Sequence, residues 1–364
     1  MTTLIARDPS ADIHEWYEGE GFSGPNDLIL KPIFLMCAPD SYDPRSEVHE
    51  EVNGYVENGM VHGSDSVEFV PQKAQEQFVM LRDKLQSLGA SIVLRPSTAG
   101  LLDEVFKADP SLNLVKPQFD DQNNLQKMCF RVLSSNFCHH ARQPEVSNQQ
   151  SDFVFVKNLA HERYGVAADL HMIFQDECFG EGTGDNIYDP ARNVFWCGYN
   201  HKHGEPDPTR GRSDLEFHEV IEQRMNFADR CHPLHVADGF FHLDTTFGVL
   251  PRGEVICYPG GMTENSLALM RQKAFADYGL NEKDYLIEID RADADKFACN
   301  FVAVNDTDIV TSAISDELKE KIEGKGYKVH RVDLSQFHMA GGGAHCMVNR
   351  INQVVAESIL TVQP

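Results

Sequence analysis

The sequence has 364 residues, of which 41% are hydrophobic and 24% are charged, with 32 Lys plus Arg against 56 Asp plus Glu. This is the composition of a globular protein that can bury a substantial core. The formal net charge of −24 argues against binding to nucleic acid or to an anionic membrane and favours a cationic small molecule as the ligand.

The sequence predicts neither a signal peptide at its start nor a membrane-spanning segment. The first 20 residues lack the basic and then apolar layout of a signal peptide, and no apolar stretch approaches the roughly 20 residues that span a bilayer. We therefore expect a cytoplasmic protein. The nine cysteines are scattered without paired spacing, which predicts reduced thiols, mostly buried, rather than a disulfide framework.

Helical periodicity is clearest in residues 71–88, where Ala74, Phe78 and Leu81 recur at spacings of four and three residues. In chain order, helices are expected over residues 71–88, 152–164, 214–227, 264–278 and 315–325. Four of these five segments are followed by a glycine, as at a helix C-cap, and then by an apolar run.

Strands are predicted between and after these helices, over residues 32–38, 91–96, 127–133, 166–173, 193–198, 242–250, 254–259, 284–290, 301–305 and 327–334. The helix, glycine and strand succession favours one α/β body of repeated units over two unrelated domains. We expect a single domain over residues 29–364, preceded by an extension of residues 1–28. Residues 47–68, 120–126 and 201–212 read as surface loops or as the rim of an active site.

The segment GGGAHC near the C-terminus offers a nucleophile. Three glycines, Gly341 to Gly343, allow the backbone to approach a ligand closely, and Cys346 lies where an apolar strand is expected to begin. A thiol attacks carbon when its pKa is lowered or a base takes its proton. The alternative is a buried structural cysteine. His345 is not the expected base, because adjacent strand residues point to opposite faces.

A better base is His242 in the segment HLDTTFGVL. Alternation along a strand would place His242 and Asp244 side by side on one face, away from the core. An imidazole beside a carboxylate suits a general base with a neighbour that binds cations. A partly exposed strand face with no chemical role is the alternative.

Two acidic loops complete the candidate site. The turn EGTGD carries Glu181 and Asp185, and the loop LLDEVFKADP carries Asp103 and Asp109. The acidic turn is not a dinucleotide fingerprint, because its acids would repel a pyrophosphate and no helix is expected after it. Its spacing also misses an EF-hand calcium loop.

Taken together and in order, these segments resemble the guanidine-modifying (pentein) superfamily, which includes arginine deiminases, arginine dihydrolases, dimethylarginine dimethylaminohydrolases and amidinotransferases. The resemblance covers residues 30–360, and the pair HLDTTF and GGGAHC is its most specific part. It implies a five-bladed α/β propeller of pseudo-fivefold ββαβ units around a central polar channel.

The same resemblance implies roles for individual residues. Cys346 matches the nucleophile, His242 the general acid/base, and Glu181 the acid that orients this histidine. Asp109 and Asp244 match the two carboxylates that hold the guanidinium nitrogens. Asp185 is a further candidate for substrate contact, and Asp103 could replace Asp109 if the loop has another register.

A guanidinium group is planar, delocalised and a poor electrophile, so its chemistry requires a soft nucleophile and anions that hold the cation. We expect hydrolysis of an arginine-like molecule through an amidino-cysteine intermediate, by deimination or dihydrolysis, without a metal or cofactor. Transfer of the amidino group to an amine is the alternative, and a non-catalytic binding protein of this fold is a third. Homo-oligomer formation stays open, as does the arginine that would bind a substrate carboxylate, with five candidates: Arg95, Arg142, Arg210, Arg212 and Arg350.

Histidines and cysteines elsewhere raise a zinc site as another hypothesis. Cys231, His232 and His235, with His201 and His203, contain metal-ligand side chains. Their spacing is looser than the paired spacing of structural zinc sites. The sequence therefore favours a metal-free protein.

Overall fold

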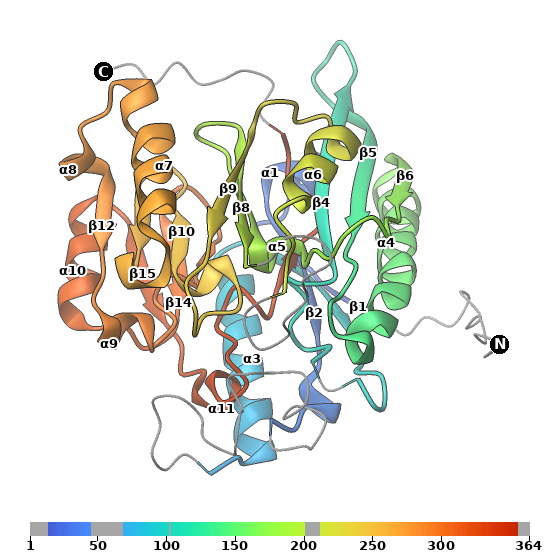
Figure 1. Cartoon of the computed structure of the whole chain (residues 1–364). Helices are drawn as coiled ribbons and strands as arrows, with labels where there is room; N and C mark the ends of the chain where they lie inside the picture. The colour runs from blue at the N-terminus through green and yellow to red at the C-terminus, as the bar shows by residue number, and fades with distance from the viewer. Residues whose placement is uncertain (1–13, 45–67, 102, 201–211, 356–364) are drawn as a thin grey trace.

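The computed structural model describes residues 14–44, 68–101, 103–200 and 212–355 (Figure 1). Their strands are β1 (Glu15–Tyr17), β2 (Ile33–Cys37), β3 (Ser91–Arg95), β4 (Ser111–Phe119), β5 (Leu125–Ser134), β6 (Ala167–Ile173), β7 (Asn186–Asp189), β8 (Val194–Tyr199), β9 (Cys231–His235), β10 (Phe247–Val249), β11 (Val255–Cys257), β12 (Leu286–Glu288), β13 (Val302–Ala303), β14 (Asp308–Thr311), β15 (Lys328–Arg331) and β16 (Asn349–Arg350).

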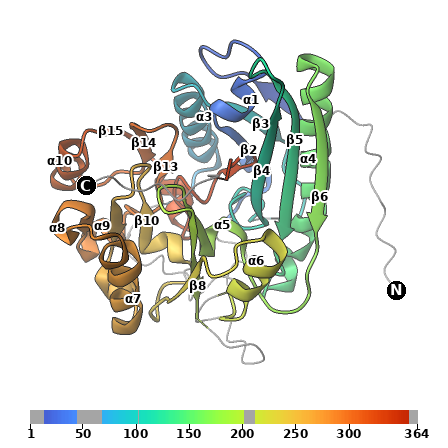
Figure 2. The same ribbon diagram turned by 90° about the horizontal axis from the view of Figure 1, so that it is seen from above.

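The α-helices in the same ranges are α1 (Asp27–Leu30), α3 (Pro71–Ser87), α4 (Gln143–Tyr164), α5 (Gly182–Asp185), α6 (Phe217–Met225), α7 (Glu264–Ala274), α8 (Glu282–Tyr285), α9 (Arg291–Ala294), α10 (Asp316–Gly324) and α11 (Ser335–His338). In the view of Figure 2, α3, α4, α6, α7 and α10 lie around the outside of the molecule and the sheets lie inside them.

The described strands form five separate sheets that share one connection pattern. In four of them an antiparallel pair is followed by a helix and by a third strand parallel to the second, as in β4, β5, α4 and β6. The other three are β7, β8, α6 and β9; β10, β11, α7 and β12; and β13, β14, α10 and β15. The mixed α/β fold and the repeated unit predicted above are therefore confirmed.

The fifth sheet joins the two ends of the described chain. Strand β16 pairs antiparallel with β2, which continues through α3 to the parallel strand β3, and β1 adds to the outer side of β3. Residues 15–17 of the predicted extension therefore contribute to this sheet, while the domain boundary at residue 28 stays a prediction. Because β16 begins three residues after Cys346, this pairing also restricts the position of the cysteine.

The five predicted helices are present, and they differ from the predictions only in where some of them begin or end. Helix α3 starts at Pro71, as expected, and α10 is capped by Ser315, whose hydroxyl accepts a hydrogen bond from the Leu318 N–H. Helix α4 begins at Gln143, nine residues before its predicted start. The prediction missed its first turns because they are polar and carry no apolar stripe. The predicted helix over residues 264–278 ends at Ala274 and continues as a separate 3₁₀ turn.

One strand prediction is wrong in a way that matters for the site. Residues 242–250 form a 3₁₀ turn over Leu243–Thr245 and only then the strand β10. His242 and Asp244 are therefore not neighbours on one strand face. Both are buried, 1% and 2% exposed, because the alternation of apolar residues here reflects a turn enclosed by other segments rather than a sheet surface.

Four strands were not predicted from the sequence, namely β1, β4, β9 and β14. Three of them have only three to five residues, which carry too little periodicity to detect, and the longer β4 contains Pro117, which interrupts a strand pattern.

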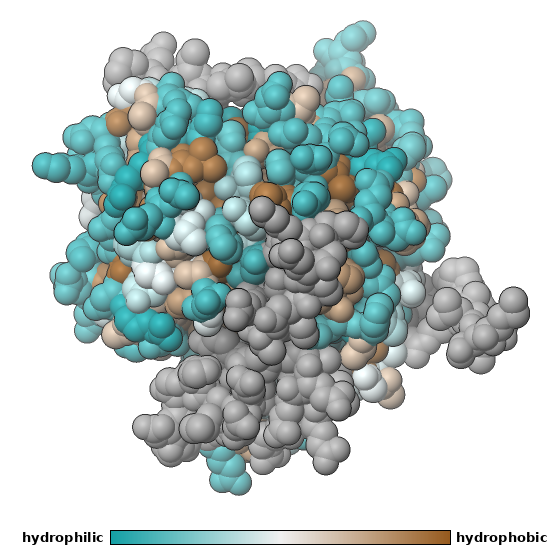
Figure 3. Space-filling model, viewed as in Figure 1, coloured by the Kyte–Doolittle hydropathy of each residue, from teal (hydrophilic) through white to brown (hydrophobic). Residues whose placement is uncertain are grey.

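Five buried hydrophobic clusters fill the spaces between sheets and helices. None of the helices in the described ranges is long and apolar enough to cross a membrane. On the face shown in Figure 3 hydrophilic residues predominate, and the hydrophobic areas are small and separated. All nine cysteines are free, and seven of them are buried, as the sequence predicted.

Candidate active site

The predicted nucleophile and the predicted general acid/base, Cys346 and His242, line the same cavity of about 10 Å³. Its other lining residues are Asp103, Phe106, Asp109, Arg142, Arg212, Phe241, Ala340, Gly341 and Gly342. A space of this size holds about one water molecule. Distant segments of the chain therefore converge on one small, largely charged cavity.

Glycines bring the cysteine loop close to its neighbours. Cys346 lies in a turn that precedes β16 rather than in a strand. A Cβ on Gly342 would lie 2.0 Å from the Cε1 of Phe106, and a Cβ on Gly343 would lie 2.7 Å from the Oδ1 of Asn300. The glycine run is thus required by close packing around the thiol.

Asn300, which the sequence analysis missed, holds this turn in place. Its Oδ1 accepts hydrogen bonds from the backbone N–H groups of His345 and Cys346 at 2.8 and 3.2 Å, and its Nδ2 donates to the Cys346 Sγ at 2.9 Å. Asn300 is fully buried. The only sequence signal was an asparagine directly before a predicted strand, which is too common to indicate a role.

The surroundings of Cys346 favour the neutral form of its thiol. Burial raises the pKa of Cys346 well above its usual range, and the charges of Asp244 and Asp109 raise it further. The Asn300 hydrogen bond acts in the opposite direction but is the weaker influence. Forming a thiolate here therefore requires a positive charge to arrive near the sulfur.

Asp244 lies beside the thiol but does not line this cavity. The Cys346 thiol points to its Oδ2 at 3.5 Å, and the same oxygen accepts a hydrogen bond from the His345 Nδ1 at 2.9 Å. The Oδ1 of Asp244 is buried without a hydrogen-bond partner. This carboxylate thus has one oxygen held beside the sulfur and one that can accept a hydrogen bond.

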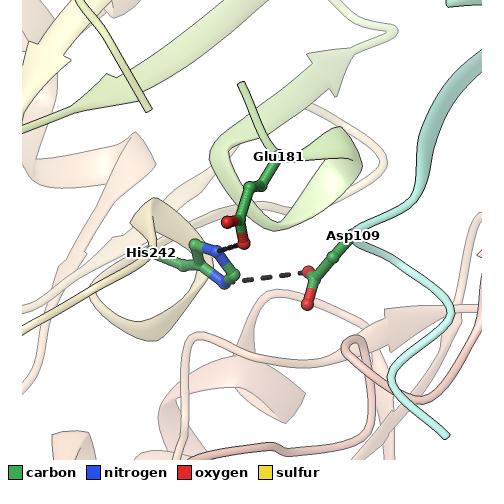
Figure 4. A group of neighbouring side chains, drawn as sticks. All are labelled: Asp109, Glu181 and His242. Carbon is green, nitrogen blue, oxygen red and sulfur yellow. Dashed lines mark hydrogen bonds and ion pairs between the residues drawn. The ribbon is translucent and has the colours of Figure 1, made fainter. Parts of the chain in front are cut away.

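His242 lies between two carboxylates, as Figure 4 shows. Its Nε2 is 2.9 Å from the Glu181 Oε2, and its Nδ1 is 3.7 Å from the Asp109 Oδ1. Burial lowers the pKa of His242, but the charges of Asp109, Asp185 and Glu181 outweigh burial and raise the pKa to about 9. At neutral pH His242 is therefore an imidazolium that can donate a proton.

A short turn built on glycine presents Glu181. Gly182 has a φ of +26° and a Cβ on Gly184 would lie 2.5 Å from the Asp109 Oδ1, so larger residues do not fit. Burial raises the pKa of Glu181, but Arg212, 3.4 Å away, and His242 together lower it to about 2. Glu181 therefore stays ionised.

Arg142 binds the acidic loop. Its Nε and Nη2 donate to the two Glu145 oxygens at 2.9 and 3.0 Å, and its Nη1 donates to the Asp109 Oδ2 at 2.8 Å. The Asp103 carboxylate lies 3.9 Å from the same guanidinium group. Asp109 and Asp103 thus both face the cavity.

Burial raises the pKa of Asp109, and it raises the pKa of Glu145 to about 7.

Asp185 does not line the cavity. Its Oδ1 accepts a hydrogen bond from the Leu243 N–H at 3.0 Å, and its Oδ2 accepts one from the Ser213 hydroxyl. Burial raises its pKa to about 7. Because Leu243 follows His242, this carboxyl anchors the turn that carries the histidine.

Asp109, Glu181 and His242 also form the metal-capable group found within the described ranges. Arg142 lies 2.8 Å from Asp109 and 3.6 Å from Glu181, and Arg212 approaches the latter. These guanidinium groups already oppose the charge that would attract a cation, so the donor set fits a metal poorly.

The alternative zinc hypothesis receives no support from the residues that can be described. Cys231, His232 and His235 lie along β9, and Cys231 is buried beside Cys197 of β8. The other two members of that hypothesis, His201 and His203, lie outside the described residues.

Comparisons with known proteins agree with the segments described above. A family model described as "N,N dimethylarginine dimethylhydrolase, eukaryotic" matches residues 56–353. The bifunctional arginine dihydrolase/ornithine cyclodeaminase ArgZ of Synechocystis sp. is 29% identical over 325 residues, which are 89% of this chain and 38% of ArgZ. This chain therefore spans well under half the length of that relative.

Solved structures show the same fold. The N-terminal domain of ArgZ, an arginine dihydrolase bound to product, has a TM-score of 0.67 at 26% identity, covering 89% of this chain and 99% of that domain. A variant of that domain is covalently bound to a reaction intermediate. An adduct of dimethylarginine dimethylaminohydrolase has a TM-score of 0.58 at 18% identity, covering 88% and 99% of the two chains.

Proposed function

The chain belongs to the N,N-dimethylarginine dimethylhydrolase family, within the guanidine-modifying superfamily, and from this premise we propose that it hydrolyses the guanidinium group of arginine or a close relative. The observation that carries the proposal is the cavity in which a buried thiol, an imidazolium and two carboxylates meet. Carboxylates bind a guanidinium group through charge-assisted hydrogen bonds, so this set of groups suits such a cation.

The excess of carboxylates explains how the thiol is activated. In the empty site the pKa of Cys346 is high, so few molecules carry a thiolate. A bound guanidinium brings a positive charge beside Cys346, Asp109 and Asp244, which favours the thiolate and satisfies the acids. Substrate binding and activation of the nucleophile are then one event.

In the first step the Cys346 thiolate attacks the guanidinium carbon and the C–S bond forms. The electron pair of the broken C–N bond leaves with nitrogen, which takes a proton from the His242 imidazolium and departs as ammonia. The product is an amidino-thioether on Cys346. Glu181, ionised and 2.9 Å from the His242 Nε2, stabilises the imidazolium before this transfer.

In the second step water attacks the same carbon. The neutral His242 accepts a proton from this water, the C–S bond breaks, and the thiolate leaves with the electron pair. The product after one round is a ureido compound. A second round on that product would release another ammonia with carbon dioxide and the amine, which is dihydrolysis.

An unsubstituted guanidinium suits the site better than a dimethylated one, because Asp109 and Asp244 accept hydrogen bonds and N-methyl groups remove donors. The arginine dihydrolase ArgZ and its N-terminal domain are 29% and 26% identical to this chain, whereas the dimethylarginine dimethylaminohydrolase structure is 18% identical. Of the five arginines considered for the substrate carboxylate, Arg142 and Arg212 line the cavity, and we assign them this role.

We further propose that the five sheets form a closed propeller around a central channel. One edge strand from each sheet, namely β4, β7, β10, β13 and β16, contributes to the wall of a single cavity of about 920 Å³. The cytoplasmic location and the absence of nucleic-acid partners stay predictions of the sequence.

The test is incubation with L-arginine, followed by measurement of ammonia, of the organic product and of the mass of Cys346. One ammonia per arginine with citrulline indicates deimination, and two with ornithine indicate dihydrolysis. Product that forms only with an added amine would support transfer instead. No product from any guanidino compound would contradict the proposal.

Replacement of the nucleophile gives the sharpest check. Cys346→Ser should lower kcat on the order of 10⁴-fold or more, because a hydroxyl at this position is a far weaker nucleophile. Cys257→Ser is the matched control, since that thiol is fully buried on β11 and lines neither cavity. Equal activity of the two variants would remove Cys346 from the mechanism.

A further inference from the structure

A second, much larger cavity reaches the site from the other side of the nucleophile. Its volume is about 920 Å³, and it shares no lining residue with the cavity that contains Cys346 and His242. Its wall includes Asp244 and His345, which lie next to the thiol, and also the exposed residues Arg252, Asn305 and Asp306. The cavity therefore extends from the surface of the molecule to the neighbourhood of the thiol.

The boundary between the two cavities is thin. The Asp244 Oδ2 lies 3.5 Å from the Cys346 Sγ and 2.9 Å from the His345 Nδ1. Cys346 lines the small cavity, and the pair of Asp244 and His345 lines the large one. A single layer of side chains thus separates the sulfur from the larger space.

The wall of the large cavity has buried polar atoms that are not hydrogen-bonded. The Asp244 Oδ1 and the Asn186 Oδ1 are acceptors without a partner, and the Arg350 Nε is a donor without one. Around them the wall is mainly apolar, with Val302 and Val348 among its members. Such a lining suits small neutral molecules that both donate and accept hydrogen bonds, namely water and ammonia.

The proposed reaction creates a need for such a route. Ammonia is the group that leaves in the first step, so the alkyl chain of arginine stays attached to the carbon on Cys346. The cavity that contains Cys346 and His242 is narrow, about 10 Å³, so a substrate chain that enters there blocks the approach of water from that side. Water must nevertheless reach the carbon before the intermediate can be hydrolysed.

We propose that the large cavity is the route by which water enters the site and ammonia leaves it while the substrate chain occupies the small cavity. This inference rests on the proposed function and adds to it that the organic substrate and the small molecules, water and ammonia, use different cavities. The organic substrate uses the side of Arg142 and Arg212, and the small neutral reactant and product use the side of Asp244 and His345.

The test narrows the large cavity without touching the catalytic residues. Ala303→Trp on β13 and Val249→Trp on β10 each place a large ring at a half-buried position of its wall, in two different sheets. Leu170→Trp is the control, because Leu170 is half-buried on β6 and lines neither cavity. L-arginine is the probe, and the decay of the adduct on Cys346 is followed by mass in a rapid chase.

In both narrowed variants the arginine adduct should accumulate and decay about tenfold more slowly, because solvent access then limits turnover. The control should keep the wild-type rate. Methylguanidine, whose adduct carries no long chain, should react through the open small cavity, so its turnover should be unchanged in all three variants.

Adduct decay at the wild-type rate in both narrowed variants would overturn the route. An equal loss with arginine and methylguanidine would also overturn it, because that pattern indicates distortion of the site. Absence of adduct and of ammonia in the wild type is a different result, since it would contradict the proposed function itself.

Discussion

Two buried charged clusters of this protein differ in how their charges are balanced. In the first, Asp152 of α4 contacts the Arg95 Nη1 at 2.6 Å and the Lys107 Nζ at 3.6 Å, and Glu104 lies 3.3 Å from the Arg95 Nε. Two carboxylates thus face Arg95 and Lys107, and the His14 Nε2 lies 2.6 Å from the Asp152 Oδ1. The opposing charges of Lys107 and Arg95 outweigh the effect of burial and lower the pKa of Asp152 to about 2.

The second cluster surrounds the nucleophile, and its acids outnumber its cations. The acids are Asp103, Asp109, Glu145, Glu181, Asp185 and Asp244, and the cations are Arg142, Arg212 and His242. Burial raises the pKa of Glu145 and Asp185 to about 7, which removes part of the excess. The balanced cluster links β3 to α4 through Arg95 and Asp152. The unbalanced cluster has an excess of negative charge, which favours binding of a cationic substrate.

The largest expected effect is the loss of stability that follows from removing a carboxylate of the balanced cluster. Asp152→Asn should lower the free energy of unfolding by about 3–5 kcal/mol, because it leaves Arg95 and Lys107 buried without their shared carboxylate. Denaturant unfolding measures this loss, and the KM of the remaining folded enzyme should be unchanged. Asp169→Asn on the exposed surface of β6 is the control and should have no measurable effect.

The pH dependence of that loss has a definite sign. The pKa of Asp152 is lower in the folded protein than its usual 3.8. Its contribution to stability is therefore present above about pH 4 and is lost as the pH falls towards 2. Unfolding of the wild type by acid should be steeper than that of Asp152→Asn in this window.

A comparable substitution in the unbalanced cluster should lower activity and leave the free energy of unfolding unchanged or higher. Asp109→Asn should lower kcat/KM by about 10- to 100-fold, since a charge-assisted hydrogen bond to the substrate is lost. Its free energy of unfolding should be unchanged or higher, because burial raises the pKa of Asp109 and so disfavours its charged form. A loss of stability as large as that of Asp152→Asn would show that the two clusters have the same role.

The smallest expected effect is a shift in pH dependence. Glu181→Gln removes a negative charge beside His242, so the pKa of His242 should fall from about 9. Because the first step needs the protonated ring, the alkaline decline of kcat should move to lower pH by about one unit or more. Glu254→Gln, outside the site, is the control and should keep the wild-type profile.

Much of the fold followed from local patterns. The helices α3 and α10 and the strands β2, β3 and β5 have enough periodic residues to be detected from the sequence. The short strands β1 and β14, of three and four residues, were missed because pairing with a neighbour, rather than their own residues, makes them strands. The turn after His242 was misjudged because alternation is a weak sign of a strand in a segment that is buried on all sides.

The sequence by itself determined the kinds of groups available for catalysis: a thiol after glycines, an imidazole near a carboxylate, and acidic loops in an acidic chain. Only the tertiary structure decided which of them meet. It placed Asp109 and Glu181 on opposite sides of the His242 ring, Asn300 against the Cys346 sulfur, and Asp185 behind the site as an anchor. The physical reason is that the charge states of these groups depend on burial and on neighbours contributed by separate sheets, and no local pattern in the chain encodes either.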